Sequence, residues 1–187
     1  MSRKIAFTSL GCDKNRVDSE VMLGILQKNG YTAGADEAEA DIIVVNTCCF
    51  IKDALEESIE TILEMAQYKN PDVGNCKGLI VAGCLGQRYE KEFFDELPEV
   101  DAIIGTTAYE SIAEVADEIL GGKEQVKQLE SIDLAMQDGN GKLRVLSTAP
   151  YFAYLKISEG CDNRCTYCVI PQMRGRHRSR ELESLVE

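Results

Sequence analysis

Two short, strongly apolar runs limit the fold of this chain more than any other feature of its sequence. Residues 41–46 read DIIVVN and residues 78–83 read GLIVAG, and both are rich in β-branched side chains. Runs of this kind are typical of strands that are buried on both faces of a parallel sheet. Helical patterns separate the apolar runs along the chain, so the sequence predicts an α/β fold.

The same alternation extends over the first 122 residues. Strands are predicted at 4–10, 31–33, 41–46, 78–83 and 102–104, and helical periodicity is found over 17–30, 52–68, 87–97 and 109–120. Five strands joined by helical crossovers predict a doubly wound, five-stranded parallel sheet of the flavodoxin or Rossmann type, with strand order 2-1-3-4-5. We therefore predict that residues 1–122 form an N-terminal domain.

The chain after residue 122 is predicted to have a different organisation. Residues 123–150 read as a connector, and QDGNG at 137–141 predicts a hairpin turn. Residues 151–187 are expected to begin a second domain, with a strand at 151–157, a cysteine-rich loop and a helix capped by Ser179. A lone strand, loop and helix cannot bury its apolar face, so the sequence predicts the front part of a longer protein.

The cysteine-rich loop carries the triplet Cys161-x3-Cys165-x2-Cys168. Three thiolates can hold a [4Fe-4S] cluster and leave one iron open, whereas electron-carrier clusters take four cysteines. A structural zinc site with His177 as fourth ligand is the alternative, although zinc ligands usually come in two separated pairs. The triplet therefore favours an iron–sulfur site at which a ligand binds the open iron.

Three further cysteines follow predicted strands. Cys12 comes after the first strand, Cys48 after the third and Cys84 after the fourth. These strands are neighbours in the predicted order, and ligands of such sheets bind at the carboxyl ends of the strands, so the three thiols should converge. The alternative is that each is a small residue in a tight turn. Cys49 is predicted to be a packing residue and Cys76 a surface thiol.

Composition narrows the classes of function. The sequence has no apolar run of about 20 residues, which a membrane helix needs, and no signal peptide at its start. Eight cysteines in a chain that is not exported indicate metal or redox chemistry in a reducing cytoplasm, with no membrane partner. The net charge of −12 suits a basic protein partner better than a nucleic acid, and it also suits simple solubility.

Four segments carry a resemblance to a known family. They are SLGCDKNRVDSE at 9–20, VVNTCCFI at 44–51, VAGCLGQRY at 81–89 and YLKISEGCDNRCTYCVIPQMRGRHRSR at 154–180. Together they resemble the methylthiotransferase family of radical S-adenosylmethionine (SAM) enzymes, and the resemblance covers nearly the whole chain. The sequence LGCDKN is similar to the branch that modifies a ribosomal protein, whereas the transfer-RNA branch typically has YGCQMN at this place.

The resemblance implies two [4Fe-4S] clusters and SAM as cofactors. It also implies a truncated radical-SAM α/β barrel that begins at residue 151. Auxiliary-cluster ligands would be Cys12, Cys48 and Cys84, ligands of the SAM-binding cluster would be Cys161, Cys165 and Cys168, and Tyr167 would lie near the adenine of SAM. The family usually has glycine where this chain has Cys49, but the motif aligns Cys48 with the ligand.

The implied reaction places a methylthio group on the β-carbon of an aspartate in the twelfth small-subunit ribosomal protein. It would need a reducing electron donor, and these 187 residues alone would be inactive. A transfer-RNA methylthiotransferase and a non-catalytic zinc or electron-carrier domain stay open as alternatives. The basic run at 174–180 would lie in the barrel near SAM, so direct RNA contact is not expected.

Polar residues beside the predicted ligands have ordinary structural explanations. Asn15, Asp18, Ser19 and Glu20 come at the start of the first predicted helix, where capping and the helix dipole favour them. Residues 46–47 precede Cys48 and are expected either to donate to cluster sulfur or to satisfy backbone groups at the strand end.

Overall fold

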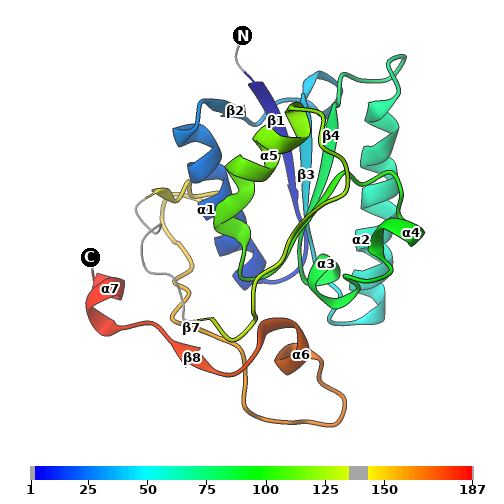
Figure 1. Ribbon diagram of the computed structural model, residues 1–187. Helices are drawn as coiled ribbons and strands as arrows, with labels where there is room; N and C mark the ends of the chain where they lie inside the picture. Colours follow the sequence, from blue (N-terminus) through cyan, green and yellow to red (C-terminus); the bar gives the residue numbers. More distant parts are fainter. Residues whose placement is uncertain (1–2, 135–142, 187) are drawn as a thin grey trace.

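A six-stranded parallel sheet forms the centre of the protein in the computed structural model, which describes residues 3–134 and 143–186 (Figure 1). The strand order is β2-β1-β3-β4-β5-β6, and every neighbouring pair is parallel. The strands are β1 (Arg3–Ser9), β2 (Tyr31–Ala33), β3 (Ile42–Thr47), β4 (Gly78–Gly83), β5 (Ala102–Ile104) and β6 (Val126–Gln128). The predicted α/β class and the order 2-1-3-4-5 are confirmed.

The sheet extends one strand beyond the sequence prediction. Strand β6 lies within residues 123–150, for which the sequence predicts a connector, and it pairs with β5. Its three residues read VKQ; Lys127 is exposed and the other two are partly buried, so this short strand has no apolar run that would reveal it. The hairpin predicted at 137–141 lies outside the described residues, and the domain boundaries stay a prediction.

Strands β3 and β4 are buried along their whole length, as their apolar sequences predict. Successive side chains of a strand point to opposite faces, so each strand supplies two cores. Ile42 and Val44 belong to the core on one face of the sheet, and Ile43 and Val45 belong to the core on the other. The continuous β-branched runs are therefore explained by helices that cover both faces.

Helices pack on both faces of this sheet (Figure 1). Helices α1 (Asp13–Lys28) and α5 (Ile112–Leu120) contribute to one core, while α2 (Lys52–Ala66), α3 (Cys84–Arg88) and α4 (Phe93–Glu96) contribute to the other. Short 3₁₀ turns are η1 (Glu37–Glu39), η2 (Gln67–Lys69) and η3 (Tyr109–Ser111). The helix predicted at 87–97 is instead split between α3 and α4. None of the helices in the described ranges has the length and apolar character that crossing a bilayer requires.

Residues 143–186 add no strand to the six-stranded sheet: they pass beside α1 and then lie below the carboxyl ends of its strands (Figure 1). Their regular elements are β7 (Ser158–Glu159), α6 (Ile170–Arg174), β8 (Arg178–Ser179) and α7 (Leu182–Val186). Strands β7 and β8 form a two-residue antiparallel pair.

Two expectations for this part of the chain are wrong. The strand predicted at 151–157 is not formed, and regular pairing in this part of the chain begins at Ser158 in β7. Its apolar residues Tyr151, Leu155 and Ile157 are exposed. Ser179 pairs in β8 and does not cap the last helix.

Candidate functional site

Three strand ends bring Cys12, Cys48 and Cys84 to one edge of the sheet. Strands β1, β3 and β4 are in register, with Ser9 opposite Asn46 and Thr47 opposite Gly83. Cys12 is the N-cap residue of α1, Cys48 follows β3 directly, and Cys84 begins α3. The sequence prediction that these thiols follow neighbouring strands at the same edge is confirmed. We call this group of three cysteines the thiol site.

Gly11 holds the loop of Cys12 against Cys48. Its φ of +89° is one that glycine adopts without strain. A Cβ atom at this position would lie 2.5 Å from Cys48 Cβ and 3.1 Å from Cys48 Sγ. The backbone before Cys12 therefore approaches Cys48 more closely than any residue with a side chain allows.

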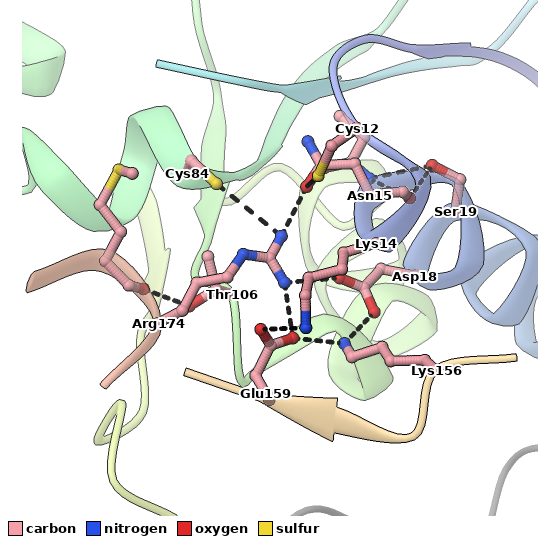
Figure 2. Close-up of polar contacts among 12 residues, drawn as sticks. Cys12, Lys14, Asn15, Asp18, Ser19, Cys84, Thr106, Lys156, Glu159 and Arg174 are labelled. Atoms are coloured by element: carbon pink, nitrogen blue, oxygen red, sulfur yellow. Dashed lines mark hydrogen bonds and ion pairs between the residues drawn. The ribbon is translucent and has the colours of Figure 1, made fainter. Parts of the chain in front are cut away.

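A buried guanidinium lies within the thiol site (Figure 2). Arg174 Nη2 donates to Asn15 Oδ1 at 2.5 Å and lies 3.8 Å from Cys84 Sγ. Cys12 Sγ lies 4.0 Å from the same Asn15 oxygen. Burial raises the pKa of the Cys84 thiol above its usual value, and the positive charge of Arg174 opposes this rise.

The thiol site has the donor set of an iron–sulfur cluster. All eight cysteines are free. Within residues 3–134 and 143–186, no three His, Cys, Asp or Glu side chains are arranged to hold one metal ion. A [4Fe-4S] cube differs from a single ion, because each thiolate binds a different iron and the sulfur atoms stand further apart. Three soft thiol donors around the Gly11 turn therefore fit such a cluster better than a single zinc ion.

The second triplet lies on the loop between β7 and α6. The amide of Cys161 donates to Gly175 O at 3.1 Å, and the amide of Cys168 donates to Cys165 O at 3.1 Å, which closes a turn. Cys165 is exposed and the other two thiols are partly buried. Tyr167 is 85% exposed, so its predicted place beside adenine stays a prediction.

A cavity of about 440 Å³ opens beside Cys161. It is lined by Ile132, Asp133, Cys161, Asp162, Arg164, Pro171, Gly175 and Arg176. Its lining carries charged side chains of both signs beside Ile132 and Pro171.

Four buried charged residues join the triplet's segment to helix α1, and the sequence did not predict this arrangement (Figure 2). Lys156 Nζ lies 2.5 Å from Asp18 Oδ1 and 2.8 Å from Glu159 Oε2. Arg174 Nη1 lies 2.6 Å from Glu159 Oε2 and 3.3 Å from Asp18 Oδ2. Each of the four side chains is at most 7% exposed. We call Asp18, Lys156, Glu159 and Arg174 the buried charge cluster.

The ion pairs of this cluster keep Lys156 and Glu159 charged. Burial disfavours the Lys156 ammonium, but attraction by Asp18 and Glu159 is stronger and raises the pKa of Lys156 to about 12. Burial likewise disfavours the Glu159 carboxylate, but Arg174 and Lys156 lower its pKa to about 2. Two cations and two anions therefore balance each other away from water.

The polar start of α1 faces inward, which capping and the helix dipole, the explanations that the sequence suggests, do not account for. Asn15, Asp18, Ser19 and Glu20 are all buried. Asp18 and Ser19 follow Asn15 by three and four positions, which places all three side chains on one helical face. This polar stripe is the sequence signal that could have revealed a buried network.

Asn46 and Thr47 satisfy backbone groups at the strand end. Asn46 Nδ2 donates to Asn15 O and to Ser19 Oγ, both at 2.9 Å, and Thr47 Oγ1 donates to Ala82 O at 2.7 Å. Of the two expectations for these residues, the structural role is confirmed. The polar side chains of Asn15 and Arg174 contact sulfur atoms of the thiol site.

The two remaining cysteines pack in the core. Cys49 is 1% exposed and its Sγ lies 3.3 Å from Met173 Sδ, which confirms its predicted packing role. Burial raises the pKa of the Cys49 thiol to about 11. The prediction that Cys76 is a surface thiol is wrong, because Cys76 is buried and its Sγ donates to Gly78 O at 3.2 Å.

Comparison with known proteins places the chain in a family. The model of the Uncharacterized protein family UPF0004 matches residues 4–105, which is more than half of the 187 residues. The chain belongs to this family. The UPF0004 match spans the whole thiol site and ends before the second triplet.

Curated relatives of this UPF0004 member carry one functional name. A protein of Lachnoclostridium phytofermentans named ribosomal protein uS12 methylthiotransferase RimO is 56% identical over 184 residues, or 98% of this chain and 41% of the relative. Proteins of the same name from Acetivibrio thermocellus and Clostridioides difficile are 52% and 49% identical, over 100% and 98% of this chain and 41% and 40% of the relatives. The chain thus spans about two fifths of these relatives.

Among solved structures, the radical S-adenosylmethionine methyltransferase TsrM from Kitasatospora setae, with cobalamin and a [4Fe-4S] cluster bound, is similar to the UPF0004 chain. The TM-score is 0.62 at 14% identity, over 100% of this chain and 45% of TsrM. At this low identity the likeness concerns the fold alone.

Proposed function

We propose that this chain supplies the cluster-binding N-terminal part of a radical-SAM methylthiotransferase that acts on an aspartate of ribosomal protein uS12. The observation that carries the proposal is the convergence of Cys12, Cys48 and Cys84 on one sheet edge, where Arg174 of the segment with the second cysteine triplet reaches Cys84. Relatives named RimO over nearly the whole chain support the same function.

The proposed cofactors are two [4Fe-4S] clusters and SAM. Cys12, Cys48 and Cys84 would hold the auxiliary cluster, and Cys161, Cys165 and Cys168 would hold the cluster that binds SAM. Together these groups supply a carbon radical that removes a hydrogen atom and a methylated sulfur that takes its place.

The chain's own residues position these groups. The Gly11 turn and the aligned ends of β1, β3 and β4 hold the first three thiols together. The buried charge cluster holds the segment with the second triplet against α1. Together these contacts fix the two sets of thiols relative to each other, which the transfer of sulfur to a short-lived radical requires.

The proposed partners follow from the same chemistry. A reducing electron donor is needed to start each turnover. Ribosomal proteins are basic, and the net charge of −12 would attract such a substrate. The reduced thiols and a ribosomal substrate both favour the cytoplasm.

The test uses the full-length gene product after anaerobic reconstitution. We expect iron and sulfide for two clusters, with about half lost in a Cys12→Ala, Cys48→Ala, Cys84→Ala variant and the other half lost in a Cys161→Ala, Cys165→Ala, Cys168→Ala variant. Cys76→Ala is the matched control and should keep all the iron, because Cys76 precedes β4 and Cys84 follows it, which puts the two at opposite ends of that strand. Stoichiometric zinc, or a single cluster, would overturn the proposal.

Substrate choice has a separate test. Incubation with SAM and a reductant should add a methylthio group to uS12, detected by peptide mass spectrometry. A transfer-RNA digest from the same reaction should stay unmodified. Modification of transfer RNA alone would favour the second candidate, a transfer-RNA methylthiotransferase.

A further inference from the structure

Arg174 connects two parts of the protein that are far apart in sequence. It ends α6, a few residues after the second triplet, yet its Nη2 lies 3.8 Å from Cys84 Sγ, 90 positions earlier in the chain. The same nitrogen donates to Asn15 Oδ1, which lies beside Cys12 Sγ. One guanidinium of the cysteine segment (residues 154–180) therefore reaches into the thiol site.

The position of this guanidinium is fixed from several sides (Figure 2). Its Nη1 pairs with Glu159 at 2.6 Å and with Asp18 at 3.3 Å. The preceding carbonyl, Met173 O, accepts a hydrogen bond from Thr106 Oγ1 at 2.8 Å, and the Met173 side chain contacts Cys49. These contacts leave Nη2 directed at Asn15 and Cys84.

The charge of the thiol site explains why a cation is placed there. A thiolate that binds iron is anionic, and both Cys48 and Cys84 are buried, so their negative charge needs a partner. Arginine suits this role because its guanidinium stays protonated and offers donors in a rigid plane. The carboxylates of Asp18 and Glu159 are also paired with Lys156. Their negative charge therefore neutralises the positive charge of Arg174 only in part, and the rest can stabilise anionic sulfur.

We propose that Arg174 is a positioning residue that partly neutralises the sulfur-rich site formed by Cys12, Cys48 and Cys84 and thereby raises the reduction potential of a cluster bound there. The inference rests on the proposed function. A nearby positive charge and an N–H donor stabilise the reduced, more negative state of a cluster more than the oxidised state. The cluster would therefore accept an electron more readily with the cysteine segment docked.

The experiment isolates the auxiliary cluster. The full-length gene product carries Cys161→Ala, Cys165→Ala and Cys168→Ala, so that only the thiol site binds iron. Midpoint potentials and iron content are measured anaerobically with Arg174 intact, with Arg174→Lys and with Arg174→Gln. We expect the potential to become more negative in the Gln variant and to lie between the two in the Lys variant, which keeps the charge but not the plane of donors.

A matched control breaks a comparable contact elsewhere. Arg144 Nε pairs with the buried Glu20 of α1 at 2.5 Å, and none of its contacts within the described residues is with a cysteine. Arg144→Gln should leave the auxiliary potential unchanged. An equal shift in this control and in Arg174→Gln would overturn the proposal, because a general loosening of α1 would then be the cause.

A double variant that keeps the net charge tests the proposal even if Arg174→Gln alone does not fold. Asp18→Asn with Arg174→Gln removes one anion and one cation and leaves Lys156 paired with Glu159. Its potential should be more negative than that of Asp18→Asn alone, and equal potentials would overturn the proposal. If the background protein with Arg174 intact bound no iron, the proposed function itself would fail, and this inference with it.

Discussion

Lys156 Nζ lies 2.5 Å from Asp18 Oδ1, although 138 positions separate the two residues. Both side chains are 7% exposed, so this pair joins helix α1 and the cysteine segment where water is excluded. A buried pair of this kind specifies how two segments dock, because a displaced charge would be left without a partner.

Removing one member of this pair should therefore be costly. Lys156→Met leaves Asp18 and Glu159 with one cation fewer, and we expect the free energy of unfolding to fall by about 3–5 kcal/mol. Urea denaturation followed by circular dichroism measures the change. Lys52→Met is the control, because Lys52 forms only an exposed pair with Glu56 and should change little.

The double variant Asp18→Asn with Lys156→Met should recover part of the lost stability. It removes an anion together with the cation, and Arg174 then pairs with Glu159. A double variant no more stable than Lys156→Met would show that the two charges do not interact in solution.

Glu20 should make stability depend on pH at the acid end. Burial alone raises its pKa, but hydrogen bonds from Ser147 and the ion pair with Arg144 are stronger and lower it below 4.5. The stability that ionised Glu20 contributes is therefore fully present above about pH 4.5 and is lost as the pH falls through the lowered folded-state pKa. Urea midpoints of the wild type and Glu20→Gln should differ most near pH 7 and converge in acid.

The control for this measurement is Glu60→Gln on the exposed side of α2. It should follow the wild-type curve across the same range of pH. If the urea midpoints of wild type and Glu20→Gln differed by the same amount down to about pH 2, the prediction would be wrong. Protonation of Glu20 would then have no effect on stability.

Gly11→Ala should damage the thiol site more than an equivalent change elsewhere. Gly30 has a similar φ of +83°, but a Cβ added there would meet no atom within 4 Å, so Gly30→Ala should cost about 1–2 kcal/mol for the left-handed backbone alone. Gly11→Ala adds the clash with Cys48 and should also lower the iron bound by Cys12, Cys48 and Cys84. Equal losses of stability, with iron unchanged, would rule out the close approach of the two loops.

Thiol alkylation distinguishes the exposed from the buried cysteines in the cluster-free protein. Cys12 and Cys165 are exposed and should react first with iodoacetamide. Cys49 and Cys76 should react only after denaturant is added, because both are buried and burial raises the pKa of each thiol. Peptide mass spectrometry locates the label, and rapid native labelling of Cys76 would restore its surface assignment.

The sheet could be predicted because its signals are local. The apolar runs at 41–46 and 78–83 identify two central strands, and right-handed crossovers leave few ways to order the other strands. The shared edge for Cys12, Cys48 and Cys84 then follows from strand order alone. Strand β6 could not be predicted because three residues, VKQ, of which Lys127 is exposed, carry too little pattern.

The buried charge cluster could not be predicted for a different reason. Nothing in the sequence around Asp18 or Lys156 shows which charge across the chain will meet it, since the pairing depends on how the cysteine segment docks. Arg174 belongs in sequence to a basic run at 174–180, yet it is 4% exposed. The prediction for Cys76 is wrong because its sequence neighbours are polar, while its own side chain faces the core formed with Leu79.

The parallel sheet also sets the order in which the chain can assemble during synthesis. All six strands of the sheet lie before residue 129, whereas Lys156, Glu159 and Arg174 leave the ribosome later. N-terminal units fold first as a chain is made, so we expect the sheet and α1 to form before the partners of Asp18 are present. The later arrival of Lys156 and Arg174 provides those partners, so docking of the cysteine segment should follow assembly of the sheet.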